Sequence, residues 1–192
     1  RAKTDAEWGG FAVDLNDPGN QIHRFFAGLS EYIFETELGV ADPPLIDYVA
    51  DLLFRFVRAE SMVRIRTLTG RPVTEVAEMM GEADHRIGMA RREVHRHIGD
   101  FTLFWTGVYP EALREMQRSD RKDQFVDYCH QGKRAYHIAS TIPTDDEQSV
   151  PGSVLLDLSE HFEMCAYGLR EIRREWERRD DDPDRPHVLL IG

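Results

Sequence analysis

The sequence predicts an all-α protein: a single-domain helical bundle of about five to seven helices with little or no β-structure. Apolar residues recur at steps of three and four along most of the chain, as they do on the buried face of a helix. Neither an alternation of strands with helices nor a glycine-rich phosphate loop is recognisable. The chain has 192 residues, of which 41% are hydrophobic and 31% are charged, which is the size and balance of one globular domain.

Residues 1–20 are predicted to form an N-terminal arm, because they are rich in glycine and show no sustained period. A first helix is expected over residues 21–38, with Asn20 as its cap and Gly39 at its end. Its apolar face holds Ile22, Phe25, Phe26, Leu29 and Ile33.

A second helix begins after Asp42, which serves as its cap, and places Pro43 in its first turn, where a missing N–H costs little. Gly70 and Pro72 end it. Its apolar seam consists of Leu45, Val49, Leu52, Phe56, Ala59 and Val63.

The middle of the chain is predicted to hold shorter helices over residues 73–80 and 85–98. Gly99 is expected to interrupt the helical pattern, and Asp100 to cap a new helix through the aromatic block that ends at Val108. Gly107 is expected to allow close helix contact, and residues 110–118 to add another turn or two.

The last third is predicted to contain two helices separated by an acidic loop at residues 145–147. Ser119 or Asp120 opens the first of them, and Ser149 or Pro151 opens the second. The seam of the final helix steps close to 3.5 residues, which favours bundle packing, and consists of Leu155, Leu158, Phe162, Cys165, Leu169, Ile172 and Trp176. The bundle domain is therefore residues 21–179, followed by an acidic tail at residues 180–192.

The charge pattern argues against a nucleic-acid partner, because phosphate contacts need a basic surface and the net charge is −11. No apolar run approaches the roughly 20 residues of a membrane span, so no membrane partner is expected. No basic-then-apolar leader is recognisable in the sequence, which begins at Arg1 and leaves open that a leader was removed. A cytoplasmic location is the expectation. One stretch, residues 85–97, is locally basic and is either an anion-binding or acidic-partner patch or a solvated helix face.

The most distinctive segment is HIGDFTLFWTGVYPE, residues 97–111. It resembles a motif of the form H-x-G-D-x-x-L-F-x-x-G-x-x-P-E in a group of bacterial all-helical proteins of unassigned function, and residues 132–136 and 155–176 match its downstream elements. Because that group has no assigned activity, the resemblance implies a helical fold and no particular chemistry. The Gly–Asp pair at residues 99–100 also resembles the distal helix of haem oxygenases. That resemblance would make His23, early in the first predicted helix, the iron ligand.

Four polar residues on or beside apolar helix faces are candidate metal ligands: Glu60, His97, His137 and His161. Inward-facing imidazole and carboxylate groups are how helical bundles bind iron and other transition metals. The alternative is four unrelated residues on the margin of the core, each hydrogen-bonded to a neighbour. A di-iron site of the usual kind needs two Glu-x-x-His pairs, and only the Glu82–His85 pair is present.

The two cysteines, Cys129 and Cys165, both lie on apolar faces. Buried packing is the expected role, and a disulfide or redox pair requires their two helices to be neighbours. No serine lies in a nucleophile-elbow context, so hydrolase chemistry has no support.

The functional hypothesis from the sequence is association, with a second copy or with a partner protein, without catalysis and without a cofactor. The alternative is a metal- or haem-binding helical enzyme built on the histidines. A third reading is a small-molecule-binding bundle in which the aromatic block around Trp105 forms a pocket wall.

Overall fold

The computed structural model describes residues 18–57, 65–67, 70–118 and 121–180. Within these residues it contains eight α-helices, one π-helix (η1) and two short 3₁₀ helices (η3, η4). In chain order they are α1 (Pro18–Glu31), η1 (Tyr32–Glu37), α2 (Pro43–Val57), α3 (Val76–Asp84), α4 (Gly88–Gly107), η3 (Pro110–Ala112), α5 (Leu113–Met116), η4 (Lys122–Phe125), α6 (Tyr128–Thr141), α7 (Gly152–Glu160) and α8 (Phe162–Asp180).

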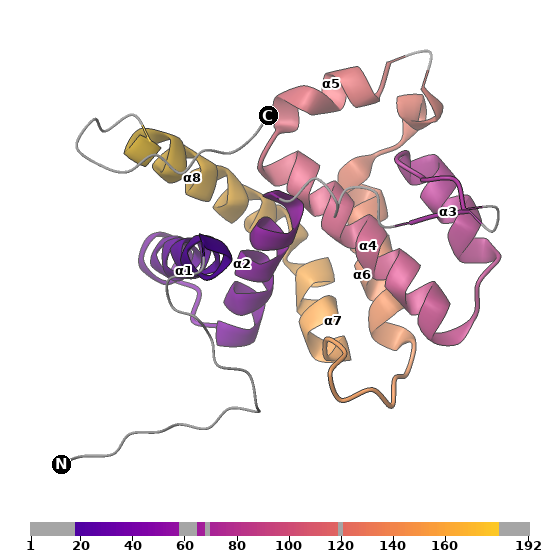
Figure 1. Ribbon diagram of the computed structural model, residues 1–192, viewed down its shortest axis with the longest axis horizontal. Coiled ribbons are helices and arrows are strands. Elements are labelled where there is room, and N and C mark those ends of the chain that lie inside the picture. Colours follow the sequence, from indigo (N-terminus) through magenta and orange to yellow (C-terminus); the bar gives the residue numbers. More distant parts are fainter. Residues whose placement is uncertain (1–17, 58–64, 68–69, 119–120, 181–192) are drawn as a thin grey trace.

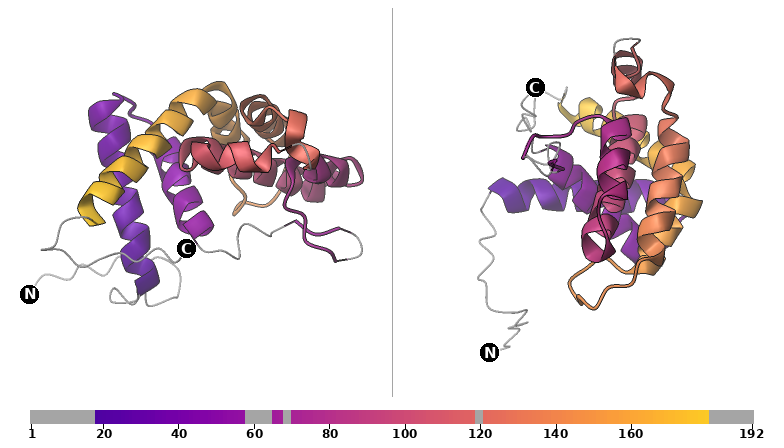
Figure 2. Two further views of the ribbon diagram at one scale, coloured as in Figure 1. Left: turned by 90° about the horizontal axis from the view of Figure 1, so that it is seen from above. Right: turned by 90° about the vertical axis from the view of Figure 1, so that its right-hand side faces the viewer.

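Helix α4 lies at the centre of the fold and packs against α2, α3, α6 and α8 (Figure 1). Helices α1 and α2 stand at one end beside α8, and α3 lies at the other end (Figure 2). The all-α, single-domain prediction is confirmed. In the described part of the chain, β-structure is limited to one isolated antiparallel bridge between Arg66 and Pro72. None of the described helices has the length and apolar character that crossing a membrane requires.

The two predicted apolar seams are buried. In α2 the seam residues from Leu45 to Phe56 are at most 1% exposed, whereas Ala59 and Val63 lie outside the described residues. The seam of the final helix is also buried throughout, from Leu155 at 0% to Trp176 at 5%. That helix divides at His161 into α7 and α8, which is one reason why there are more helices than expected.

The prediction that Gly99 interrupts a helix is wrong. Helix α4 runs without a break through Gly99, and a Cβ atom built there would lie 2.6 Å from ring atoms of Tyr136 on α6. Glycine is needed at this position for the close approach of an aromatic ring, not for a turn. Asp100 is consequently a mid-helix residue and caps nothing. The close contact expected at Gly107 is present, because a Cβ there would lie 2.7 Å from Cβ of Leu169 on α8.

Several helix boundaries also differ from the prediction. The second helix was expected to continue to Gly70, but α2 ends at Val57, and residues 65–67 are not helical because Arg66 forms the bridge to Pro72. Helix α1 begins at Pro18, inside the expected arm, and residues 1–17 lie outside the described part of the chain. Helix α6 begins at Tyr128, where the Asp127 carboxylate accepts the His130 N–H at 3.0 Å as an N-cap. The expected caps Ser119 and Asp120, like tail residues 181–192, are outside the described residues.

Candidate functional site

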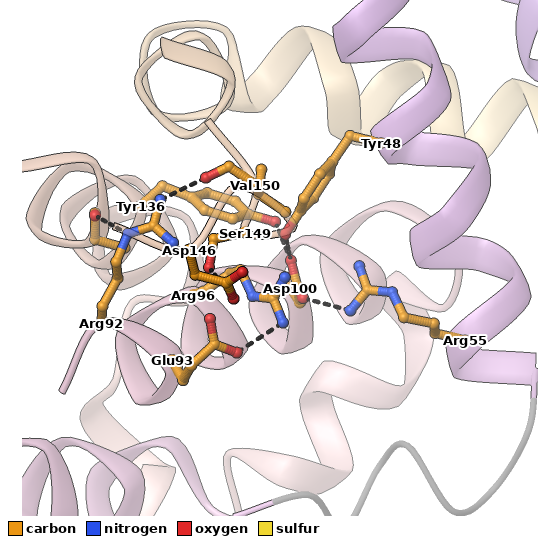
Figure 3. A network of polar contacts seen from close by, with 11 residues as sticks. Tyr48, Arg55, Arg92, Glu93, Arg96, Asp100, Tyr136, Asp146, Ser149 and Val150 are labelled. Carbon is orange, nitrogen blue, oxygen red and sulfur yellow. Dashed lines mark hydrogen bonds and ion pairs between the residues drawn. The ribbon is translucent and has the colours of Figure 1, made fainter. Parts of the chain in front are cut away.

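Helix α4 carries one polar residue per turn on the face that meets α2 and α6. Arg92, Arg96 and Asp100 are spaced four apart, so their side chains follow one line along the helix. Figure 3 shows this line, with Tyr48 and Arg55 of α2 and Tyr136 of α6 pointing toward it. We call Asp100, Tyr48, Arg55 and Tyr136 the Asp100 hub.

The Asp100 carboxylate is 1% exposed and connects three helices. Its Oδ1 atom accepts hydrogen bonds from the Tyr48 hydroxyl at 2.5 Å and the Tyr136 hydroxyl at 2.9 Å. Its Oδ2 atom accepts a hydrogen bond from Nη1 of Arg55 at 2.8 Å. Both carboxylate oxygens are therefore satisfied, as a buried charge requires.

The electrostatics of the hub fix its protonation state. Burial by itself raises the pKa of Asp100, but the charges of Arg55 and Arg96 and the Tyr48 hydrogen bond outweigh it, so the pKa lies below its usual value. Burial, followed by the negative charge of Asp100, raises the pKa of Tyr48 and of Tyr136 well above the usual range. At neutral pH the hub is a carboxylate, a guanidinium and two neutral phenols. No proton in it is poised to move near neutrality, so the hub supports the fold and does not resemble an acid–base catalyst.

Arg92, one turn before Arg96, is fully buried and joins two distant parts of the backbone. Its Nε atom donates to the Ala139 carbonyl at 3.1 Å and its Nη2 atom to the Val150 carbonyl at 2.5 Å. The end of α6 and the residues before α7 are thereby both tied to α4 (Figure 3).

A pocket of about 300 Å³ opens between α4, α5, η4 and the start of α3. Its apolar wall consists of Phe101, Trp105, Ala112, Met116 and Tyr128. Polar side chains complete the lining: Thr74, Glu75, Glu115, Arg121 and Asp123. We call this the aromatic pocket. Its volume and apolar lining are typical of small-molecule sites.

The most buried acid of the aromatic pocket, Asp123, is used by the fold. Its carboxylate accepts the N–H groups of Val76 at 2.9 Å and Ala77 at 2.8 Å, so it caps the N-terminus of α3. It also accepts the Tyr128 hydroxyl at 2.7 Å, and burial together with this bond raises the pKa of Tyr128.

The other charges of the aromatic pocket are paired as well. Glu75 lies 3.6 Å from Arg121, and Glu115 lies 2.8 Å from Arg118. Each acid that lines the aromatic pocket therefore already has a partner, and the pocket offers a ligand no uncompensated charge.

The structure places the predicted metal ligands in different surroundings. Glu60 lies outside the described residues. His97 is 3% exposed and stacks on Phe56, with ring centroids 6.1 Å apart, whereas His137 and His161 are exposed. Within the described part of the chain, no three His, Cys, Asp or Glu side chains are grouped so that they could hold a metal ion. The metal hypothesis stays a prediction, and elemental analysis and a visible absorption spectrum of the purified protein test it.

The remaining histidine and cysteine candidates have local roles. His23 Nε2 lies 2.7 Å from the Asp51 carboxylate, and His85 Nδ1 lies 2.6 Å from the Gly81 carbonyl. Cys129 and Cys165 are both free thiols, half-buried and buried respectively.

Sequence reasoning missed the Asp100 hub because it treated Asp100 as a cap. The available signal was the spacing of Arg92, Arg96 and Asp100, which places three charged groups on one helix line beside apolar residues. The partners Tyr48 and Arg55 on α2 and Tyr136 on α6 show no local sequence pattern that indicates their contact with Asp100.

Comparison with known proteins adds no relationship: no family model matches the chain, and no curated protein or solved structure matches it significantly. The resemblance of residues 97–111 to the bacterial helical group stays a prediction.

Proposed function

We propose that this chain is a small-molecule-binding protein, and that its ligand is a neutral, largely apolar molecule containing an aromatic ring. The observation that carries this proposal is the aromatic pocket, which combines a volume of about 300 Å³ with an apolar wall on one side of α4.

The geometry of the wall supports an aromatic ligand. The rings of Phe101 and Trp105 are 6.1 Å apart and tilted by 59°, and those of Phe101 and Tyr128 are 6.3 Å apart and tilted by 53°. Tilted rings present both faces and edges, which are the two surfaces that an additional aromatic ring contacts favourably. A neutral ligand is favoured because the pocket's charges are already compensated, and a charged group would be desolvated without a partner there.

Binding without catalysis is supported by the state of the polar side chains in the aromatic pocket. Asp123 is occupied by two backbone N–H groups and a phenol, and the raised pKa of Tyr128 keeps its proton in place. Neither is available as a general base for a bound molecule.

The test uses the neutral fluorophore N-phenyl-1-naphthylamine, whose emission rises in an apolar site. The variant is Ala112→Phe, which adds a ring to the wall of the pocket without removing a core side chain. We expect it to weaken probe binding about tenfold or more, because the added ring occupies the ligand's space. Ala90→Phe, the same change at an exposed position of α4, is the control and leaves binding unchanged. Equal probe binding by both variants would refute the proposal.

Association with a second copy of the chain is a second candidate function. The observation in its favour is Ile87, which is 87% exposed directly before α4 and is followed by Met89, which is 36% exposed. Because copies with a net charge of −11 repel each other, apolar association strengthens as salt screens that repulsion. Light scattering after size exclusion at low and high salt tests this, with Ile87→Ser expected to abolish any dimer. A monomer under both conditions would contradict it.

A further inference from the structure

Helix α4 is flanked by α3 and α6 (Figure 1). A second, smaller pocket lies among side chains of these three helices, and the proposed function does not use it. Its volume is about 90 Å³, the space of roughly three water molecules. Its polar lining consists of Asp84 from α3, Arg91 and His95 from α4, and Gln131 and Arg134 from α6. We call it the polar pocket. It is too small for an organic cofactor and large enough for one small polyatomic ion.

The polar pocket contains two arginines, Arg91 of the basic stretch at residues 85–97 and Arg134 of α6. The other arginines of the basic stretch are already engaged. Arg86 and Arg96 there are paired with Glu82 and Glu93, at 3.6 Å and 2.8 Å. Arg92 is bound to backbone carbonyls, as described above.

Arg91 and Arg134 have no carboxylate within ion-pair distance among the residues that the structure describes. The contact of Arg91 Nε with His95 Nε2 is 3.5 Å long, at the outer limit of a hydrogen bond. Two guanidinium groups with free donors therefore meet at one cavity in a protein of strongly negative net charge.

We propose that the polar pocket binds a small oxoanion of the sulfate or phosphate type. Arg91 and Arg134 supply the positive charge, and the Gln131 amide supplies a further donor. Planar guanidinium groups match the spacing of oxygen atoms on such anions, which makes the pair a stronger anion site than two lysines. Asp84, also in the lining, limits the net charge of the site and disfavours a cluster of several anions.

His95 couples this site to pH. It is 7% exposed, and burial, followed by the charge of Arg91, lowers its pKa to about 4, with Arg134 acting in the same direction and Asp84 opposing it. A bound dianion offsets the two arginines and favours the imidazolium, so the pKa of His95 rises on binding. The complex then takes up a proton, and anion affinity increases as the pH falls from 7 toward 5.

Isothermal titration calorimetry with sodium sulfate tests the site, with sodium chloride holding the ionic strength constant. Sulfate does not titrate in this pH range, so any pH dependence belongs to the protein. We expect Arg134→Gln and Arg91→Gln each to weaken binding about tenfold or more, because each removes charge-assisted hydrogen bonds. Arg174→Gln is the matched control, since Arg174 lies on α8 with its side chain 67% exposed. His95→Gln is expected to make sulfate affinity independent of pH.

Inorganic phosphate and phenyl phosphate, titrated in parallel, identify the source of the anion. If phenyl phosphate binds more tightly than inorganic phosphate, the natural ligand is the phosphate group of a larger molecule. If it binds equally or more weakly, the natural ligand is the free ion. Because Arg134 is exposed, its glutamine variant is expected to fold normally, which circular dichroism checks. Absence of saturable sulfate binding, or an equal loss in Arg174→Gln and Arg134→Gln, would overturn the proposal. The Ala112→Phe variant leaves this site intact, so the two proposals fail independently.

Discussion

Replacing Asp100 by asparagine keeps the shape of the side chain and removes the charge around which the hub is built. Both tyrosine hydroxyls donate to Oδ1 and Arg55 donates to Oδ2, so an asparagine whose oxygen takes the Oδ1 position keeps the tyrosine bonds. Its amide NH₂ group then faces the Arg55 guanidinium, donor against donor. The perturbation therefore falls first on the ion pair with Arg55, and it also removes the attraction between Asp100 and the Arg96 charge.

The expected cost follows from the burial of that pair. Breaking a fully buried ion pair costs about 3–5 kcal/mol. The Arg55 side chain is 26% exposed, so water partly solvates the orphaned cation and the lower end, about 3 kcal/mol, applies. For a domain of this size, that corresponds to a fall of roughly 6–12 °C in Tm.

The assay is urea unfolding followed by far-UV circular dichroism. Asp51→Asn is the control, because Asp51 is 60% exposed and pairs with His23 on the surface, so its loss costs less than about 0.5 kcal/mol. Adding Arg55→Met to Asp100→Asn removes the orphaned cation, and the double variant is expected to be more stable than Asp100→Asn alone. If Asp100→Asn were as stable as Asp51→Asn, the hub would not contribute to the fold as argued.

Three further outcomes are expected. The pKa of Asp100 is lower in the folded than in the unfolded state, so the ionised carboxylate stabilises the fold above about pH 4, and this stabilisation is lost as the pH falls through the folded pKa. Urea unfolding between pH 5 and 3 should therefore show a steeper loss of stability in the wild type than in Asp100→Asn. Gly99→Ala is expected to lower the stability of the fold by about 1–3 kcal/mol, because the added methyl group clashes with Tyr136. Gly81→Ala has open space around it in α3 and is expected to raise the stability by up to about 1 kcal/mol. Thermal unfolding compares the two variants. The Cys165 thiol, whose pKa burial raises to about 12, is expected to resist a disulfide reagent at pH 8 until the protein is unfolded, and an equally fast reaction in the native state would contradict this.

The sequence predicts which segments are helical better than it predicts where each helix begins, ends or is interrupted. Seams such as Leu45–Phe56 are visible because burial repeats with the helical period, and the structure buries them. The interruption predicted at Gly99 failed because glycine also serves where a neighbouring helix approaches closely, and the neighbour, Tyr136, is distant in the sequence.

The sites were less predictable because their partners come from separate helices. Asp100 meets Tyr48 and Tyr136, which are 52 and 36 residues away, and no local pattern encodes such pairings. The aromatic block around Trp105 was recognisable as core or pocket wall, but the acids that complete the aromatic pocket come from α5, η4 and the residue preceding α3. The basic stretch at residues 85–97 was compatible with an anion or acidic-partner patch and with a solvated helix face, and Arg134, the second cation of the polar pocket, comes from α6.

The cap on α3 has a consequence for the order in which this chain acquires its structure. The first amides of α3 are held by Asp123, which is synthesised 46 and 47 residues after them. Until η4 docks, the first turn of this nine-residue helix has no side-chain acceptor, and so short a helix is marginal alone. We therefore expect the start of α3 to form together with η4, late in synthesis, and amide hydrogen exchange to find the two segments opening as one unit.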